Sequence, residues 1–537
     1  MKKFHLIILS CLSGILFTIG WPVNGFPAFL FTALIPLLII EEHILKNRQN
    51  FNRFSVFFYT FPAFFIWNVA TTWWIWNSTP VATLAWAFNS MFMSIVMNVY
   101  HGVRRNLYKQ SQGYFILIFL WITFEYIHLN WKLTWTWLNL GNGFAMYYKW
   151  IQWYEYTGVL GGTFWIILIN ILIFKALKPI LNKQIDRKII IQNGLSALAV
   201  LVIPILVSYI MYIRYDEKKD PVTVIVCQPN LDPYSTQYST PPLDVIDINL
   251  DLAKSVWDKK PAFIVSPESA IQEDIWEENL DGSPSLNKLK DFTKENPEIK
   301  IVIGASTYRR YGERDKLPNS VRFHKYGKFH YDSYNTAFYI DSSGVLQKHH
   351  KSKLTPGVEY MPTGGIFKFL ENYAIDLGGT VGTLGIDDDP QPFNISDSIK
   401  IGPIICYESI FGGFCTDYVR KGANALFIIT NDGWWGNTPG HRQHLSFVSL
   451  LAIETRRSIA RSANTGISCF ANQRGDIQQA TKYWEQDVIK QDINLNSEIT
   501  VYSRFGDYFG RISSFVSVLF LLLAIVFGIK NKNQIKS

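Results

Sequence analysis

The chain has 537 residues, of which 48% are hydrophobic, and a formal net charge of +8 at pH 7. A single hydrophobic core rarely serves a chain of this length, so we expect two or three folded units. Sixteen of the 51 Lys and Arg residues cluster at the chain ends and in short segments between long apolar runs, which is typical of a protein that crosses a membrane repeatedly and argues against nucleic-acid binding.

Eight apolar segments are long enough to be transmembrane helices, because one crossing of a bilayer needs about 20 residues. We expect these spans at residues 4–20, 27–41, 54–77, 83–100, 113–130, 159–177, 189–212 and 511–529. The first span follows Lys2 and Lys3 as a signal peptide would, but no small-residue cleavage site comes after it, so we expect a retained membrane anchor. Residues 1–212 therefore hold seven predicted spans, and residues 511–537 hold an eighth span with a short tail.

The distribution of Lys and Arg predicts the orientation of these spans. If the N-terminus is cytoplasmic, the basic loops 42–53, 101–112 and 178–188 and the C-terminal tail all lie in the cytoplasm, as the positive-inside rule requires. The two shortest loops on the opposite side carry no Lys or Arg. Both termini are therefore expected in the cytoplasm, with residues 213–510 on the other side of the membrane.

Three polar side chains, Asn89, Asn98 and Glu125, lie inside the predicted spans. A polar group at membrane depth often marks a functional site, but it also forms hydrogen bonds that join helices. We favour the second role for all three.

Residues 213–510 have the pattern of a soluble α/β domain. Helices are expected at Asp244–Trp257 and His441–Ser462, and together with short apolar runs they predict a layered α/β sandwich. Residues 374–398 lack periodicity and are expected to form a loop, in which Asp387 to Asp389 are solvated rather than ligands of a cation. No glycine-rich nucleotide-binding motif follows a predicted strand. The predicted strands are Val222–Cys227, Phe263–Ser266, Ile301–Gly304, Ala337–Ile340, Ile399–Ile405, Ala425–Thr430 and Ile467–Phe470.

Three reactive side chains stand at the ends of predicted core segments of this domain. Cys406 ends the run Ile-Gly-Pro-Ile-Ile, Glu268 follows Phe-Ile-Val-Ser-Pro, and Lys351 follows Gln-Lys-His-His. A thiol, a carboxylate and an amine are the parts of an acyl-transfer site, in which a base and a cation favour the thiolate. Chemistry alone leaves other roles open: a buried packing residue or a disulfide with Cys415 for the cysteine, and solvated surface charges for the other two.

The segments around these residues resemble those of the nitrilase superfamily. The similarity lies in residues 267–270, 351–362 and 406–408, and also in Asn-Asp-Gly-Trp-Trp-Gly at 431–436. It implies an αββα sandwich in which Glu268 is the general base, Lys351 the cation beside the oxyanion, and Cys406 the nucleophile. It further implies no metal or other cofactor, and supporting roles at the active site for Glu359, Tyr407, Glu408 and Trp434.

A nitrilase-like domain between spans seven and eight resembles one membrane-bound family, the bacterial apolipoprotein N-acyltransferases. This resemblance covers essentially the whole chain and implies that Cys406 takes a fatty acyl chain from a phospholipid as a thioester. The acyl chain then passes to the N-terminal amine of a diacylglyceryl-modified apolipoprotein. The resemblance also implies a monomeric inner-membrane protein with a periplasmic catalytic domain. Loops at 361–370 and 374–398 are expected to shield the thioester from water.

Two other functions remain open at this point. The first is a membrane-tethered carbon–nitrogen hydrolase that uses the same triad with water as the second nucleophile, although a soluble substrate would not need eight spans. The second is a non-enzymatic transporter or scaffold with a degenerate domain, although all three triad positions are intact.

Overall fold

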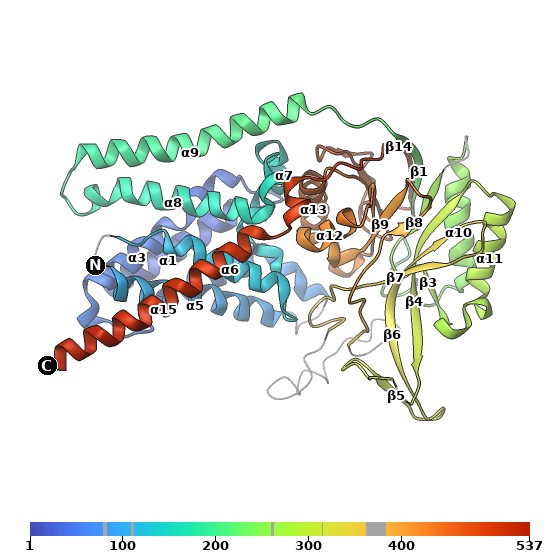
Figure 1. The fold of residues 1–537 in the computed structure, drawn as a ribbon, viewed down its shortest axis with the longest axis horizontal. Coiled ribbons are helices and arrows are strands. Elements are labelled where there is room, and N and C mark those ends of the chain that lie inside the picture. The colour runs from blue at the N-terminus through green and yellow to red at the C-terminus, as the bar shows by residue number, and fades with distance from the viewer. Residues whose placement is uncertain (79–82, 109–111, 259–261, 314, 361–382, 537) are drawn as a thin grey trace. The chain divides into compact units, whose positions relative to one another are not determined.

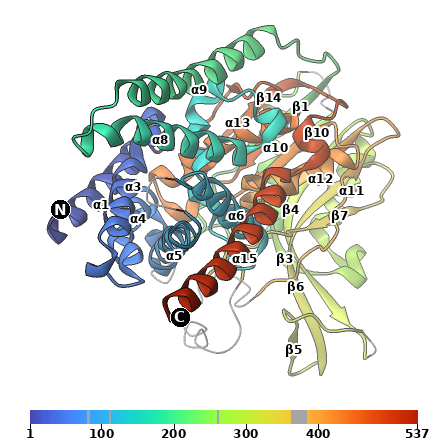
Figure 2. The same ribbon diagram turned by 60° about the vertical axis from the view of Figure 1, so that its left-hand side comes forward.

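The computed structural model describes the chain except residues 79–82, 109–111, 259–261, 314, 361–382 and 537 (Figure 1). The chain forms two units. Unit 1 contains Met1–Trp73, Thr83–Arg214 and Asp507–Ser537, and unit 2 contains Trp74–Ala82 and Tyr215–Gly506. Within unit 1 the helices run alongside one another (Figure 2), whereas unit 2 holds the β-sheets.

Every predicted span overlaps a helix of unit 1. Four helical segments among the described residues are long and apolar enough to cross a membrane, namely Pro27–Lys46, Val159–Leu181, Arg187–Arg214 and Tyr508–Lys530. The total of eight crossings therefore stays a prediction. The long helices are α1 (Lys3–Ile19), α3 (Ile35–Lys46), α4 (Ser55–Thr72), α5 (Leu84–Leu107), α6 (Ile116–Asn130), α8 (Val159–Leu181), α9 (Arg187–Arg214) and α15 (Tyr508–Lys536).

The predicted third span, at 54–77, is wrong at its C-terminal end. Helix α4 ends at Thr72, and a short 3₁₀ turn covers Trp73–Asn77. The segment Trp74–Ala82 belongs to unit 2 rather than to unit 1. The apolar pattern missed this change because Trp73, Trp74 and Trp76 at its end continue the hydrophobic run, although their ring N–H groups suit them to polar contacts.

The polar residues of the predicted spans join helices of unit 1, as expected. Asn89 donates to Asn68 Oδ1 at 2.8 Å, which connects α5 to α4. Asn98 accepts from the backbone N–H of Phe57 at 3.3 Å. Glu125 of α6 accepts from Thr163 of α8 at 2.6 Å. These bonds satisfy polar groups that would otherwise be buried alone in an apolar bundle.

Unit 2 contains two β-sheets. The first has the strand order β14-β1-β2-β4-β6-β5, with β3 beside β4 and β7 beside β6, and the second has the order β13-β12-β11-β10-β9-β8. The first is built from β1 (Pro221–Gln228), β2 (Phe263–Val265), β3 (Ile271–Trp276), β4 (Lys300–Tyr311), β5 (Arg322–His324), β6 (Phe329–Ile340), β7 (Gln347–His350) and β14 (Asp487–Asn494). The second is built from β8 (Phe393–Asn394), β9 (Lys400–Ile405), β10 (Ala425–Thr430), β11 (Ser458–Ala463), β12 (Cys469–Ala471) and β13 (Ile477–Gln478). All seven predicted strands overlap observed ones.

Alternation of side chains along these strands builds four layers. Val224 of β1 lies in a core shared by both sheets, together with Phe427 of β10. The next residue, Ile225, packs instead with residues of two helices that cover the first sheet. Ile404 of β9 packs in the same way with the helices of the second sheet. The result is the expected αββα sandwich. The covering helices are α10 (Pro242–Ser255), α11 (Pro284–Glu295), α12 (Gly412–Arg420) and α13 (Pro439–Thr455).

The predicted helix His441–Ser462 is wrong in its second half. Helix α13 ends at Thr455, because Arg456 adopts a left-handed backbone with a φ of +50°. The chain then forms β11, which pairs with β10 in parallel. The β11 residues are all buried, so tertiary packing, rather than local β propensity, makes this segment a strand.

Candidate active site

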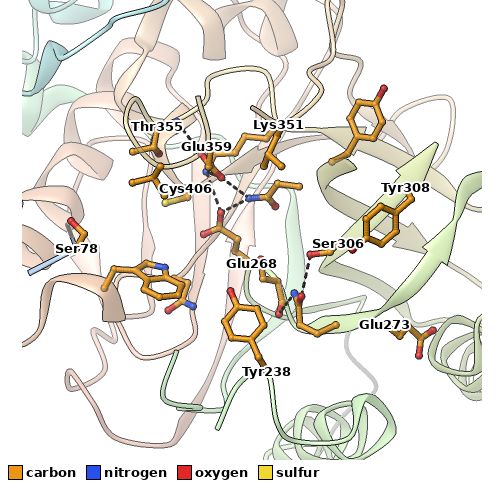
Figure 3. A pocket seen from close by; sticks show the side chains of 18 of the residues that line it. Ser78, Tyr238, Glu268, Glu273, Ser306, Tyr308, Lys351, Thr355, Glu359 and Cys406 are labelled. Carbon is orange, nitrogen blue, oxygen red and sulfur yellow. Dashed lines mark hydrogen bonds and ion pairs between the residues drawn. The ribbon is translucent and has the colours of Figure 1, made fainter. Parts of the chain in front are cut away.

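Glu268, Lys351 and Cys406 line one cavity of about 290 Å³ in unit 2 (Figure 3). Cys406 directly follows β9 and Lys351 directly follows β7, while Glu268 comes three residues after β2. Both β2 and β9 have parallel neighbours, so their reactive side chains lie at carboxyl ends of strands, where α/β proteins usually bind ligands. The structure therefore brings together the three predicted residues.

Lys351 lies between two carboxylates. Its Nζ is 3.2 Å from Glu268 Oε1 and 2.9 Å from Glu359 Oε1. The side-chain amide of Asn335, in β6, donates to the same two oxygens at 2.7 and 3.1 Å. Lys351 is 1% exposed and Glu268 6%. Water screens these charges only weakly, and their geometry is fixed by direct bonds.

The pKa values of these groups follow from burial and mutual charge. Burial raises the pKa of Glu268, an effect that Lys351 opposes and Glu359 reinforces. Burial acts to raise the pKa of Glu359 too, but Lys351 outweighs it and lowers that pKa. Burial alone would lower the pKa of Lys351, but the two carboxylates raise it well above its ordinary value. Burial, with the charge of Glu268, raises the pKa of the Cys406 thiol. The thiol is therefore neutral at rest, and Glu268 is the more basic of the two carboxylates.

Cys406 occupies a sharp turn at the end of β9. Its φ of +50° lies in the left-handed region, which costs a residue with a Cβ roughly 1–3 kcal/mol. Ser269, next to Glu268, has a φ of +55°. Gly304 permits that second turn, since a Cβ at this position would lie 2.6 Å from the Cα of Glu268. Both turns are held in strained form by their surroundings, as is common at functional sites.

A buried hydrogen-bond network holds the backbone carbonyl of Cys406. Ser409 Oγ donates to that oxygen at 2.7 Å, and His444 Nε2 lies 2.9 Å from Ser409 Oγ and 3.3 Å from the carbonyl oxygen. Asp432 bonds the other ring nitrogen of His444 at 2.9 Å and pairs with Arg461 at 2.6 Å. Burial would raise the pKa of Asp432, but Arg461 and His444 lower it far below its ordinary value. An ionised Asp432 thus anchors the ring that supports the turn.

Replacing His444 by alanine is expected to slow acylation of Cys406 by about 10- to 100-fold, because a shift of about 1 Å in a reacting group can cost on that order. His444 does not line the cavity in the described structure, so KM should change little. The control is His441→Ala, because His441 lies on the same helix but stacks on Tyr483 with ring centroids 3.9 Å apart. Equal rate losses in both variants, or a change confined to KM, would contradict a positioning role.

Two of the four predicted supporting residues line the cavity. Glu359 is the second carboxylate of Lys351, and its other oxygen accepts from the backbone N–H of Thr355 at 2.9 Å. Trp434 lies on the cavity wall, with its ring edge-on to that of Tyr234 at 5.2 Å.

Tyr407 and Glu408 do not belong to the described lining of the cavity. Tyr407 is buried against Phe411, edge-on at 5.1 Å. Glu408 is fully buried, and its carboxylate accepts from the backbone N–H groups of Ile405 at 2.7 Å and Ser352 at 2.6 Å. Glu408 therefore joins the residue before Cys406 to the residue after Lys351.

Sequence reasoning missed several residues of the cavity wall, among them Asn335, Tyr238 and Ser78. Asn335 left no clear signal, because it stands among polar residues just before the predicted strand Ala337–Ile340, although it is only 8% exposed in the structure. Ser78 left none, because it lies far from the triad in the sequence.

Ser78 belongs to a segment, Trp74–Ser78, that packs beside the tryptophans of the cavity. The rings of Trp74 and Trp435 lie 4.8 Å apart, and Trp74 Nε1 donates to Gln443 at 3.2 Å. Asn77 donates to the carbonyl oxygen of Trp435 at 2.9 Å. Ser78, which follows the predicted span 54–77, therefore contributes to the cavity wall.

The other roles considered for the triad do not fit this structure. All five cysteines are free, and Cys415 packs in the core beneath the second sheet. Glu268 and Lys351 are buried rather than solvated. Asp387 is not simply solvated either, because it accepts from the backbone N–H of His350 at 3.0 Å.

The loops expected to shield the thioester are described only in part. Residues 361–370 and 374–382 lie outside the described residues, and beyond them Leu384 lines the cavity. In the part of the chain that the structure describes, no group of three His, Cys, Asp or Glu side chains is placed to hold a metal ion.

Comparison with known proteins covers both units. The family model of the apolipoprotein N-acyltransferase N-terminal domain matches residues 13–172, and that of the carbon–nitrogen hydrolases matches residues 250–501. An apolipoprotein N-acyltransferase of Chlorobaculum tepidum is 27% identical, covering 98% of this chain and 97% of that protein. One of Thermotoga maritima is 24% identical, covering 98% and 95%. A nitrilase-superfamily amidase of Nesterenkonia has 14% identity and a TM-score of 0.35, covering 54% of this chain and 96% of its own.

The double sheet and the match over residues 250–501 assign unit 2 to the carbon–nitrogen hydrolase class. Within this class, the match of residues 13–172 to the apolipoprotein N-acyltransferase N-terminal domain and the relatives that cover 98% of the chain identify one family. The chain belongs to the apolipoprotein N-acyltransferase family.

Proposed function

We propose that this enzyme transfers a fatty acyl chain from a membrane phospholipid to the N-terminal amine of a diacylglyceryl-modified apolipoprotein. The observation that carries the proposal is the meeting of Glu268, Lys351 and Cys406 in one cavity, in a chain whose full-length relatives are named apolipoprotein N-acyltransferases. The cysteine carries the acyl chain as a thioester between two half-reactions.

In the first half-reaction the thiol of Cys406 attacks an ester carbonyl of the phospholipid, and Glu268 accepts the thiol proton. The raised pKa of Glu268 makes it a stronger base than an ordinary carboxylate. Negative charge develops on the carbonyl oxygen beside Lys351 and the backbone N–H of Tyr407, and such stabilisation is typically worth about 3 kcal/mol per donor. The ester bond then breaks, and the lysophospholipid leaves with the proton from Glu268.

In the second half-reaction the neutral amine of the apolipoprotein attacks the thioester carbonyl. Glu268 takes a proton from the amine nitrogen and returns it to the leaving sulfur, which restores the thiol. The thioester divides one difficult acyl transfer into two easier steps. Because the lysophospholipid leaves before the amine reacts, the enzyme should show ping-pong kinetics. Glu359 stays ionised through both steps, since its pKa is lowered, and it holds Lys351 in place.

The membrane helices suit substrates that are anchored by acyl chains. Drawing such a chain into water costs about 0.8 kcal/mol per CH₂ group, so a site reached from the bilayer avoids that cost. We place the protein in the bacterial inner membrane as a monomer with eight spans and both termini in the cytoplasm. Residues 1–212 and 511–537 carry the spans, and residues 213–510 form the periplasmic catalytic domain.

Mass spectrometry of the full-length protein tests this proposal. After incubation with palmitoyl-containing phosphatidylethanolamine, the peptide Ile401–Arg420 should gain the mass of one palmitoyl group. That peptide also contains Cys415, so the Cys415→Ala variant should keep the gain and Cys406→Ala should lose it. A diacylglyceryl-cysteine peptide should then remove the acyl group and become N-palmitoylated. Loss of the acyl group to water alone, with hydrolysis of small amides, would support a hydrolase instead.

A further inference from the structure

His349 lies in β7, two residues before Lys351, and its side chain is fully buried. It is not among the described residues that line the catalytic cavity, and the two half-reactions proposed above do not use it. An ionisable side chain is costly to bury unless its polar atoms are hydrogen-bonded. The contacts of its ring therefore indicate what it does.

Both ring nitrogens of His349 face carboxylates. Nε2 lies 3.1 Å from Glu408 Oε2, and Nδ1 lies 3.3 Å from Asp387 Oδ2. A neutral imidazole has one N–H group and one lone pair, so it can donate to only one of these oxygens and turns its lone pair toward the other. The imidazolium ion donates to both. The geometry therefore favours a positively charged His349 between two negative carboxylates.

The charges around the ring favour its protonated form. Burial acts to lower the pKa of His349, but Glu408 and Asp387 outweigh it and raise that pKa to about 9. The other titratable groups on this side are Tyr418, whose hydroxyl lies 3.1 Å from Nε2, and Cys415, which donates to the backbone carbonyl of Glu408 at 3.5 Å. Burial, together with Glu408, raises the pKa of each well above its ordinary value, so neither adds a charge beside the ring.

The two carboxylates also hold the backbone around the proposed triad. Glu408 accepts from the backbone N–H of the residue after Lys351, at 2.6 Å, and of the residue before Cys406, at 2.7 Å. Asp387 accepts from the backbone N–H of the residue before Lys351, at 3.0 Å. A charged His349 attracts both carboxylates, whereas a neutral ring would leave them to repel each other where water screens charge only weakly. The ring therefore ties these two backbone supports together.

We propose that His349 is a positioning residue that fixes Lys351 relative to Cys406. Its cation does so through the two carboxylates and the backbone hydrogen bonds that they accept. The inference rests on the proposed acylation of Cys406, in which Lys351 stabilises the developing oxyanion. When the ring loses its proton, the carboxylates repel each other and the lysine is no longer held beside the reacting carbonyl.

The titration of His349 predicts how acylation depends on alkaline pH. A pKa raised on folding gives a stabilisation that is fully present below the unfolded value of about 6.5 and is lost as the pH rises through the folded value of about 9. The rate of acylation should therefore fall above a pH of about 9. Lys351 and Cys406 do not explain such a fall, because the pKa values of both are raised to well above that range.

The experiment follows acylation of Cys406 by mass in a single turnover, after the full-length protein in detergent is mixed with micelles of palmitoyl-containing phosphatidylethanolamine. His349→Gln keeps an N–H donor but cannot carry the charge. At neutral pH it should slow acylation by about 10- to 100-fold, because a shift of about 1 Å in a reacting group can cost on that order. The fall of the rate at alkaline pH should disappear from this variant.

Asp387→Asn tests a change that a role in the fold alone would not produce. Asparagine keeps an oxygen for the backbone N–H before Lys351, but it removes one of the two charges that raise the pKa of His349. A neighbouring opposite charge typically moves a pKa by about 1 to 3. The alkaline fall should therefore move to lower pH by about one pH unit or more, and an unchanged position would contradict the proposal.

Two variants test other sources of the alkaline fall. Tyr418→Phe removes the hydroxyl beside the ring of His349. His350→Gln replaces the neighbouring histidine, which stacks on Tyr334 with ring centroids 4.0 Å apart. Both variants should keep the fall near the pH of the parent protein. Its loss from either one would assign the fall to another group and overturn the proposal.

Thermal unfolding separates a failure of this inference from a failure of the proposed function, because it needs no substrate. The parent protein should be more stable than His349→Gln at neutral pH, and the difference should shrink above a pH of about 9. A parent protein that does not acylate Cys406 would overturn the proposed function. If the parent does acylate Cys406, an alkaline fall that persists in His349→Gln, or a stability difference that does not shrink, would overturn the role of His349.

Discussion

Replacing Glu268 by glutamine is expected to slow acylation of Cys406 by about 10²–10⁴-fold, the usual contribution of a general base. Glutamine keeps an oxygen for the bonds from Asn335 and Lys351, so the cavity should keep its shape. It cannot accept the thiol proton, and burial holds the pKa of that thiol high. Single-turnover appearance of acyl-enzyme, followed by mass, measures the effect.

The matched control for this change is Glu273→Gln. Glu273 lines the same cavity, but its carboxylate bonds Ser283 and Ser285 rather than Lys351. Its substitution should leave the acylation rate within a few fold of the parent. A loss in Glu273→Gln as large as in Glu268→Gln would remove the case for Glu268 as the base.

The same residue predicts how the rate depends on pH. Acylation needs ionised Glu268, and its pKa is raised above the ordinary carboxyl value. The rate should therefore fall on the acid side at a higher pH than an ordinary glutamate would give. This acid limb should disappear in Glu268→Gln, whose residual rate needs no carboxylate. If the rate of Glu268→Gln still falls at low pH as in the parent protein, the ionisation of another group causes that fall.

Replacing Lys351 by methionine should damage both activity and stability. Lys351 is the cation that pairs with Glu268 and Glu359, and removing one partner of a buried ion pair typically costs about 3–5 kcal/mol. Acylation should fall as well, because the developing oxyanion loses its neighbouring positive charge. Thermal unfolding of the full-length protein, with the single-turnover rate, measures both effects.

The stability loss in Lys351→Met should grow with pH. Without the cation, both buried carboxyls have folded-state pKa values above their unfolded values, so their ionisation opposes folding. The penalty is absent below the unfolded pKa values and develops as the pH rises through and above them. Lys353→Met is the control, because the Lys353 ammonium lies over the Phe411 ring at 5.4 Å, away from the two carboxylates. A larger effect at Lys353 than at Lys351 would contradict the assignment of Lys351 as the cation of the site.

The three residues proposed as the triad could be picked out from the sequence because each directly follows, or nearly follows, a predicted core segment. Glu268 follows a strand of the first sheet and Cys406 a strand of the second, and the packing of the two sheets face to face brings these carboxyl ends together. Asn335 could not be assigned in this way. It lies inside β6, and only the pairing of β6 with β4 and β7 places its amide between the two carboxylates.

The errors have a common physical cause. Ser458–Ser462 was predicted as the end of a helix because its small and polar residues lack a β pattern, yet pairing with both β10 and β12 makes this segment a strand. The end of the third span was misplaced because Trp74 is apolar, whereas its contacts are with Trp435 and Gln443, far along the chain. Partners distant in sequence decided both cases, and local patterns do not report them.

The membership of Trp74–Ser78 in unit 2 has a practical consequence for anyone who wants the catalytic half as a soluble fragment. A continuous polypeptide from Tyr215 to Gly506 would leave this piece behind. It would uncover Trp435 and the surface at Gly440, where a Cβ would come within 2.6 Å of the Trp74 ring. A fragment that keeps the contacts of unit 2 needs the Trp74–Ser78 segment, either added as a separate peptide or fused to one end of residues 215–506.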